Sequence, residues 1–311
     1  MSSVLPASFS GPGAGLGRHA AWLIAIAGFA AMYVPVYWWA ADTIWQTDEQ
    51  GHGALILAVL LWLFWGVREE IAALPEAPSP VLGWALFAFG LLLYFVGRVS
   101  GVLLLAVASQ PFVVAGLLLL MKGKAAARVA WFPLIYFIFM IPLPGTLVDS
   151  ITGPLKHWIS VIVVELLYNV GYPISRSGVV LTIGQYQMLV ADACSGLNSM
   201  FSLSALGTLF MYIMRRPNTA HNAIMLVSIL PIAFIANMVR VIALVLITYH
   251  MGDEAGQGFL HGAAGMVLML VALAFFFTLD ALLVRLLPER RATAPDSAAS
   301  TAGTDPAKSL S

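Results

Sequence analysis

The chain has 311 residues, of which 60% are hydrophobic and 10% are charged, and its formal net charge is zero. A water-soluble domain needs a far more polar surface, so this composition predicts a membrane protein. Zero net charge implies no general acidic or basic partner, and no nucleic acid is expected. Cys194 is the only cysteine, which excludes an internal disulfide framework and Cys-rich metal sites, and we predict neither a cofactor nor a metal ion.

Eight apolar segments are long enough, or nearly so, to cross roughly 30 Å of hydrocarbon as helices. They span residues 20–39, 53–67, 81–97, 102–121, 127–143, 197–214, 223–249 and 262–287. The first is too long for the apolar part of a signal peptide and is followed by no small-residue cleavage site, so it is expected to be an uncleaved anchor. The fold class predicted is an all-α polytopic membrane protein with about eight transmembrane helices.

The lysines and arginines of the loops predict the orientation, because positive charge is disfavoured on the translocated side. If the N-terminus is cytoplasmic, eleven of the fifteen basic residues lie inside. These are Arg18, Arg68, Lys122, Lys124, Arg128, Arg215, Arg216, Arg285, Arg290, Arg291 and Lys308. We therefore expect a cytoplasmic segment at 1–19, a membrane domain at 20–287, and a disordered cytoplasmic tail at 288–311, rich in Ala, Ser, Thr and Pro.

The segment 148–193 differs from the apolar spans on either side. Residues 148–168 carry Asp149, Lys156, His157 and Glu165 among apolar residues, which favours an amphipathic or re-entrant helix at the outer face. If this segment crossed the membrane, Arg215 and Arg216 would face outward, against the charge rule. Residues 179–190 are β-branched and aromatic around a glycine, which predicts a short hairpin.

Cys194 follows this hairpin and immediately precedes an apolar span. A thiol near a helix N-terminus meets unpaired backbone amides and the positive end of the helix dipole, and both stabilise a thiolate. The small neighbours Ser195 and Gly196 would let a substrate backbone approach closely. A small buried side chain without chemistry is the alternative for a lone cysteine.

Arg240 lies within the apolar run 224–247, where an unpaired guanidinium costs at least about 2.5 to 3.5 kcal/mol near the bilayer centre. It falls near the outer end of its span, and Asn237 shares its helical face. It either snorkels to lipid headgroups or faces inward, where it could stabilise a thiolate and a developing oxyanion.

A histidine near the thiol could serve in proton transfer. On the predicted topology His52, His157, His250 and His261 lie on the outer side, and periodicity does not choose among them. His261 begins the last span among small residues that permit close helix packing. Cys194, Arg240 and His261 thus come from three different spans but are predicted to lie at the same depth near the outer face of the membrane.

Three motifs together resemble the exosortase/archaeosortase family, bacterial exosortases in particular, with exosortase B as a candidate subtype. They are 193–197 (ACSGL), Pro231 followed by 237–240 (NMVR), and His261 and Gly262 with Gly265. Trp45 and residues 51–53 also resemble the N-terminal portion of that family, so the similarity covers nearly the whole membrane part.

This resemblance implies a cysteine protease or transpeptidase with Cys194 as nucleophile, Arg240 as its essential partner and His261 as acid and base. The implied substrates are exported proteins with PEP-CTERM sorting tails, cleaved at the outer face of the bacterial inner membrane in producers of exopolysaccharide. An acceptor of unknown identity would take the acyl group.

Two other functions fit parts of the pattern. A transporter or polysaccharide-export component would use Arg240 to bind an anion, but no internal repeat is visible and Cys194 would have no role. A thiol-dependent acyl or lipid transferase would use Cys194 without shortening its protein substrate.

Overall fold

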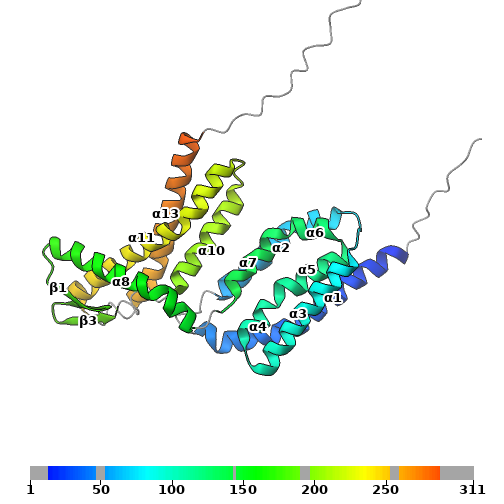
Figure 1. Ribbon diagram of the computed structural model, residues 1–311, viewed down its shortest axis with the longest axis horizontal. Helices are drawn as coiled ribbons and strands as arrows, with labels where there is room; N and C mark the ends of the chain where they lie inside the picture. Colours follow the sequence, from blue (N-terminus) through cyan, green and yellow to red (C-terminus); the bar gives the residue numbers. More distant parts are fainter. Residues whose placement is uncertain (1–12, 47–52, 143–144, 190–196, 253–258, 288–311) are drawn as a thin grey trace, which may run out of the picture.

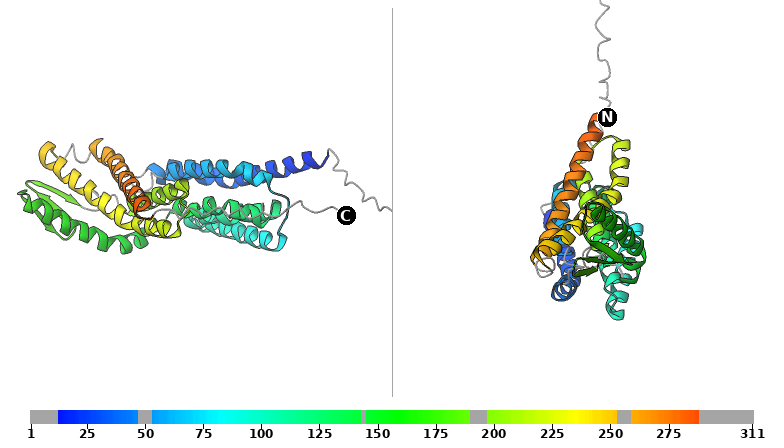
Figure 2. Two further views of the ribbon diagram at one scale, coloured as in Figure 1. Left: turned by 90° about the horizontal axis from the view of Figure 1, so that it is seen from above. Right: turned by 90° about the vertical axis from the view of Figure 1, so that its left-hand side faces the viewer.

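The computed structural model describes residues 13–46, 53–142, 145–189, 197–252 and 259–287. These residues form two groups of helices that lie beside each other along the long axis of the molecule (Figures 1 and 2). The N-terminal group contains α1 (Gly13–Asp42), η1 (Ile44–Gln46), α2 (Gly53–Ala73), α3 (Pro80–Ser100), α4 (Leu103–Ala108), α5 (Gln110–Met121), α6 (Lys124–Val129), α7 (Trp131–Tyr136) and η2 (Phe137–Met140). The C-terminal group contains α8 (Gly145–Asn169), β1 (Ile174–Ser177), β2 (Val180–Ile183), β3 (Tyr186–Leu189), α10 (Leu197–Met214), α11 (Thr219–Met251) and α13 (Phe259–Leu286).

Five of the described helices are long and apolar enough to cross a membrane, which agrees with an all-α polytopic membrane protein. They are Ala20–Gln46, Pro80–Ser100, Leu103–Met121, Thr219–Met251 and Val267–Leu286. The other three of the eight predicted spans are not long and apolar enough in the structure to meet this criterion. Helix α2 carries Arg68, Glu69 and Glu70 near its end, the segment 127–143 is broken into α6, α7 and η2, and α10 has only a shorter apolar part, Phe201–Met214.

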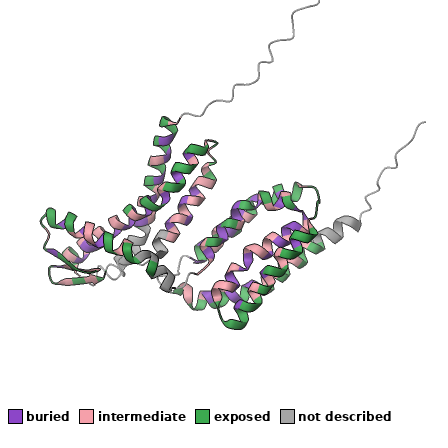
Figure 3. Ribbon diagram, viewed as in Figure 1, coloured by how far each residue is buried: buried purple, intermediate pink, exposed green. Residues whose placement is uncertain are grey.

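The outward faces of the N-terminal helices are apolar and exposed (Figure 3). On α1, Leu23, Ile24 and Trp38 are all more than 60% exposed, and Trp84 and Phe95 are similarly open on α3. Large apolar side chains of this kind are stable beside lipid chains and unfavourable in water. Helix α1 begins at Gly13, seven residues before the first predicted span, and residues 288–311 lie outside the described part of the chain.

Three glycines spaced by seven residues bring α3 close to α4 and α5. Gly83, Gly90 and Gly97 are all buried on α3. A Cβ atom on Gly90 would lie 2.9 Å from the backbone nitrogen of Val113, and one on Gly97 would lie 2.5 Å from that of Ala106. Small residues at such a seam allow the two backbones to approach closely. Close packing matters in a membrane because burial of apolar surface supplies little driving force between helices that already contact lipid.

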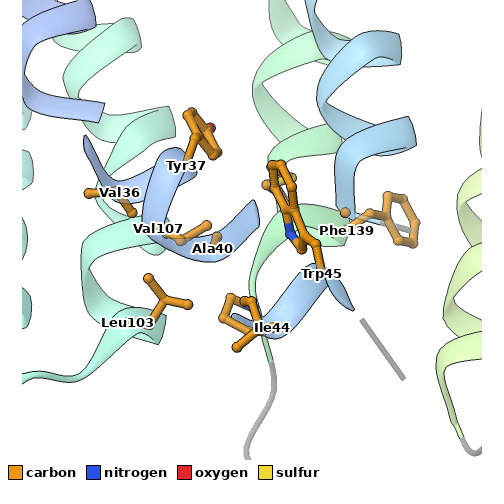
Figure 4. Close-up of a pocket in the computed structure, with 11 residues that line it drawn as sticks. Val36, Tyr37, Ala40, Ile44, Trp45, Leu103, Val107 and Phe139 are labelled. Carbon is orange, nitrogen blue, oxygen red and sulfur yellow. The ribbon is translucent and has the colours of Figure 1, made fainter. Parts of the chain in front are cut away.

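Trp45 packs against the first residue of α2 in a similar way. A Cβ on Gly53 would overlap the indole ring, so a larger residue here would have to displace the Trp45 side chain. The indole also lines a small cavity of about 20 Å³ with Tyr37 of α1 and Phe139 of η2 (Figure 4). Trp45 thus joins the end of α1 to the start of α2, which gives both residues a structural role.

The small sheet confirms the predicted hairpin and extends it. Strands β2 and β3 pair antiparallel, with Ile183 opposite Tyr186 and Gly184 in a left-handed conformation at the turn (φ 56°). Strand β1 pairs with the other edge of β2 and was not predicted, because its Ser175-Arg176-Ser177 segment lacks the apolar alternation of a half-buried strand.

Helix α8 confirms that residues 148–168 are helical, within longer bounds. Ile159, Val163 and Leu167 are buried at four-residue spacing, whereas His157 and Glu165 are exposed. The buried stripe packs against the sheet and against α11 in one apolar cluster. The helix is therefore amphipathic, as its sequence predicts.

A buried ionic cluster joins the end of α13 to the loop between α10 and α11. Arg216 donates two hydrogen bonds to Asp280, from Nε to Oδ1 at 3.1 Å and from a terminal nitrogen to Oδ2 at 2.6 Å. His221 Nε2 lies 2.9 Å from the same Oδ1, and the Asp280 side chain is only 7% exposed. A carboxylate in this apolar helix is tolerated because both oxygens are bound.

The glycine seam predicts that Gly90→Ala lowers the thermal stability of the detergent-solubilised protein. The new methyl group must push α3 away from the Val113 backbone, at a cost of about 1 to 3 kcal/mol. Gly66→Ala is the matched control, since nothing lies within 4 Å of a Cβ there. Equal melting temperatures for the two variants would contradict this packing.

The ionic cluster predicts that Asp280→Asn destabilises the C-terminal group. Arg216 and His221 lose a charged acceptor, but the Arg216 side chain is 31% exposed and can turn to water, so we expect a loss of about 1 to 3 kcal/mol. The exposed Asp42→Asn serves as control in the same unfolding measurement. An unchanged unfolding midpoint would show that the cluster adds nothing to stability.

Candidate functional site

Four chain segments that flank the predicted catalytic residues meet at one end of the C-terminal group. They are the end of β3, the start of α10, the second half of α11 and the start of α13 (Figure 1). Helices α10, α11 and α13 also contact one another along their lengths. The fold therefore brings together parts of the chain that are more than 60 residues apart in sequence.

The predicted nucleophile falls in the short connection between the sheet and α10. Strand β3 ends at Leu189 and α10 begins at Leu197, and Cys194, Ser195 and Gly196 lie outside the described residues. The boundary at Leu197 agrees with the predicted start of that span. Whether the thiol meets the helix N-terminus stays a prediction.

Arg240 is buried within the protein. Its residue exposure is 5%, and that of Asn237, one turn earlier on α11, is 3%. The neighbouring buried positions Ala236, Val241 and Leu244 show that this face of α11 is covered by other elements. Arg240 thus faces the interior, and the alternative of a side chain snorkelling along lipid does not hold.

The position of Arg240 along α11 follows from helix geometry. It is the twenty-second residue from Thr219, about 32 Å along an axis that rises roughly 1.5 Å per residue. Pro231 lies between, where it removes one backbone hydrogen bond from the helix. Arg240 therefore lies in the half of α11 that contacts the sheet and away from the ionic cluster of Arg216 and Asp280.

Asn237 has a buried polar atom with no described partner. No described residue forms a hydrogen bond with its side-chain oxygen Oδ1. A buried amide oxygen left without a donor costs about 1 to 3 kcal/mol, so such groups are expected to meet a donor from another part of the protein, water or a ligand. This observation marks the Asn237 and Arg240 turn as a polar point inside an apolar bundle.

The histidines are distributed between the two ends. His261 lies in the first turn of α13, at the same end as β3 and the start of α10, but its side chain is outside what the structure describes. His157 is exposed on α8, and His250 is exposed with its Nε2 3.3 Å from the hydroxyl of Tyr172. His221 belongs to the distant ionic cluster.

An aromatic group that the sequence did not indicate fixes the sheet to α11. The Tyr249 ring lies edge-on to Tyr172, with centroids 5.5 Å apart, and a Cβ on Gly184 would lie 3.4 Å from it. Tyr186 of β3 belongs to the same apolar cluster. The signal in the sequence was weak, because tyrosines at the ends of apolar runs are equally typical of the membrane interface.

The described side chains contain no candidate metal cluster. No three His, Cys, Asp or Glu residues of the described ranges lie together as a ligand set. The mechanism that the predicted residues support requires only protein side chains.

The fold and the buried arginine define a class of protein: a polytopic helical membrane protein with a small sheet against a long helix that carries one buried guanidinium. The family model of transmembrane exosortases (Exosortase_EpsH) matches residues 44–278, which is well over half of the chain. The chain therefore belongs to the exosortase family. The comparison with curated proteins finds no significant match, and neither does the comparison with solved structures.

The matched range includes Trp45, Cys194, Arg240 and His261, so every predicted catalytic residue lies inside the family region. Membership supports a membrane-embedded sorting transpeptidase at the level of the family. No residue is assigned a role by the match.

Proposed function

We propose that this protein is a cysteine peptidase or transpeptidase that cleaves the C-terminal PEP-CTERM-type sorting tails of exported proteins. The observation that carries the proposal is the burial of Arg240 in the second half of α11, inside the region matched by the exosortase model. An arginine is buried in an apolar bundle only at considerable cost, which favours a functional role.

The first chemical step would form a covalent intermediate. The thiolate of Cys194 attacks the carbonyl carbon of the scissile peptide bond, and the carbonyl oxygen becomes an oxyanion. The guanidinium of Arg240 is permanently charged and can donate hydrogen bonds to this oxyanion, which lowers the barrier. Asn237, with its buried amide one turn away, is a supporting residue of the same site.

The second step would release the tail. The tetrahedral intermediate collapses, the carbon–nitrogen bond breaks, and His261 donates a proton to the leaving amine. The acyl group stays on sulfur as a thioester. A water molecule then gives hydrolysis, or an acceptor amine or hydroxyl gives transpeptidation, with His261 taking the proton from the attacking group.

We place the site at the periplasmic face of the inner membrane, with both termini in the cytoplasm. Arg68 lies near the end of α2, Arg215 directly follows α10, and Arg285 lies in the last turn of α13. These helix ends lie on the side opposite the start of α13 in Figure 1. Basic residues favour the cytoplasmic side, so the Cys194 end would face outward. We further link the activity to proteins exported in exopolysaccharide and biofilm formation.

The proposal predicts cysteine-dependent processing of a sorting-tail protein tagged at both ends. Coexpression with the wild-type enzyme should remove the C-terminal tag, and Cys194→Ala should leave the substrate intact. Arg240→Gln should slow cleavage about 100-fold or more, because one oxyanion donor is lost. Arg176→Gln, an exposed arginine on β1, is the control and should cleave normally.

Immunoblots of membranes with equal enzyme levels measure both tags, and mass spectrometry measures the product. A modified substrate of full length would indicate an acyl or lipid transferase instead. Normal cleavage by Cys194→Ala would exclude the thiol mechanism altogether.

A second prediction uses the fact that Cys194 is the only thiol. The rate of its alkylation by iodoacetamide, followed against pH, reports the fraction of thiolate. A nearby guanidinium favours the charged form and lowers the thiol pKa, so Arg240→Gln should shift the alkylation curve to higher pH. Arg176→Gln should leave it in place. Superimposed curves for wild type and Arg240→Gln would mean that Arg240 does not act on the thiolate.

A further inference from the structure

A large cleft separates the two helix groups at the end of α10 and the start of α11. It has a volume of about 790 Å³ and is lined by α2, α6, α7, η2, α10 and α11. Helices α7 and α10 are in contact at the wall of the cleft. The Phe132 ring stacks on Tyr212 with centroids 4.0 Å apart, and the Tyr136 hydroxyl donates to the carbonyl of Ala205 at 3.3 Å. The cleft is thus a recess between packed helices.

Its polar and apolar linings are separated along the helix axes. Arg128 lies in the last turn of α6, Arg215 directly follows α10, and Asn222 lies in the first turn of α11. The apolar wall is formed by Trp131 and Ile135 of α7 and Ile138 of η2, and α10 contributes Thr208 and Met211 to the lining. One end of the cleft is therefore basic, and the remainder is apolar.

The charge at the basic end is not neutralised within the described protein. Arg128 and Arg215 are exposed, and neither forms an ion pair with a described residue. Arg216 is bound to Asp280, and Glu70 is the one carboxylate in the lining. The two arginines Arg128 and Arg215 outnumber the single carboxylate of Glu70, so the mouth of the cleft has a net positive charge.

Arg215 is also held in an unusual conformation. Its φ of 46° makes it the one described non-glycine residue with positive φ, and this left-handed turn ends α10. Its guanidinium carbon lies 5.5 Å from the centroid of the Tyr212 ring, at the cleft wall. A bulky residue in this region is a backbone outlier that persists only where its surroundings favour it.

We propose that this cleft binds an anionic membrane phospholipid, with the phosphate at Arg128 and Arg215 and acyl chains along the wall of Trp131, Ile135 and Ile138. The leaflet involved is the one that the arginines face, which is cytoplasmic on the proposed orientation. Guanidinium groups match phosphate oxygens in geometry and charge, and the cleft volume is in the range of ligand sites. A basic helix bound at this end of the cleft would be repelled by the arginines. The positive charge of the cleft therefore favours an anion.

Lipid binding to the full-length protein, measured by native mass spectrometry, tests this proposal independently of cleavage. Phosphatidylglycerol should bind at least tenfold more tightly than phosphatidylcholine. The double variant Arg128→Gln/Arg215→Gln should weaken the binding of phosphatidylglycerol about 30-fold, because each basic residue near a membrane surface contributes about fivefold to the affinity. Ile135→Trp, which narrows the apolar part without changing charge, should weaken both lipids.

Lys124→Gln/Arg285→Gln is the matched control, because it removes two exposed charges from the same end of the molecule but outside the cleft. It should bind phosphatidylglycerol as the wild type does, and equal melting temperatures for both double variants exclude misfolding. Equal binding of the two lipids, or full affinity in Arg128→Gln/Arg215→Gln, would overturn the proposal. Displacement of the lipid by millimolar glycerol phosphate would also overturn it, since the cleft would then be a site for soluble phosphate.

Discussion

A guanidinium inside an apolar helix is the constraint on which the C-terminal half of this protein depends. Arg240 cannot face hydrocarbon without a cost of several kcal/mol, so its side of α11 must be covered by protein. Helices α8, α10 and α13 and the sheet all contact α11, and Arg240 is 5% exposed as a result. The same packing brings the end of β3 and the starts of α10 and α13 together, so two of the elements that cover one charge, β3 and α10, are also those that flank the 190–196 segment in sequence.

The features predicted correctly from sequence are those with a strong local signal. The hairpin of β2 and β3 follows from β-branched residues around Gly184, and helix α8 follows from charged residues such as Lys156 and Glu165 among apolar ones. The structure adds that its buried stripe is Ile159, Val163 and Leu167. The burial of Arg240 was one of two alternatives, because a single arginine in an apolar run says nothing about which side of its helix meets protein. The positions of Cys194 and His261 relative to it stay predictions, since the side chains fall outside the described residues.

The features that sequence reasoning missed are long-range. Asp280 lies 64 residues from Arg216, and no local pattern in either helix pairs them. The seam at Gly83, Gly90 and Gly97 has a readable seven-residue spacing, but only the approach of α5 shows why a methyl group does not fit. The division of 127–143 falls at Ala130, between α6 and α7, and at Phe137, where α7 gives way to η2, and no local sequence signal marks either position.

Two neighbouring sites at one end of the molecule solve opposite electrostatic problems. At the ionic cluster, a carboxylate in α13 is matched by Arg216 and His221, so the protein supplies its own counterions. At the neighbouring cleft, Arg128 and Arg215 have no described ion-pair partner, and on our proposal a lipid phosphate supplies the negative charge. Because both sites involve the loop between α10 and α11, an anion bound in the cleft would hold this loop against α6 and α7. Since α10 continues from that loop to the start of the Cys194 segment, fixing its inner end would also limit how far its outer end can move.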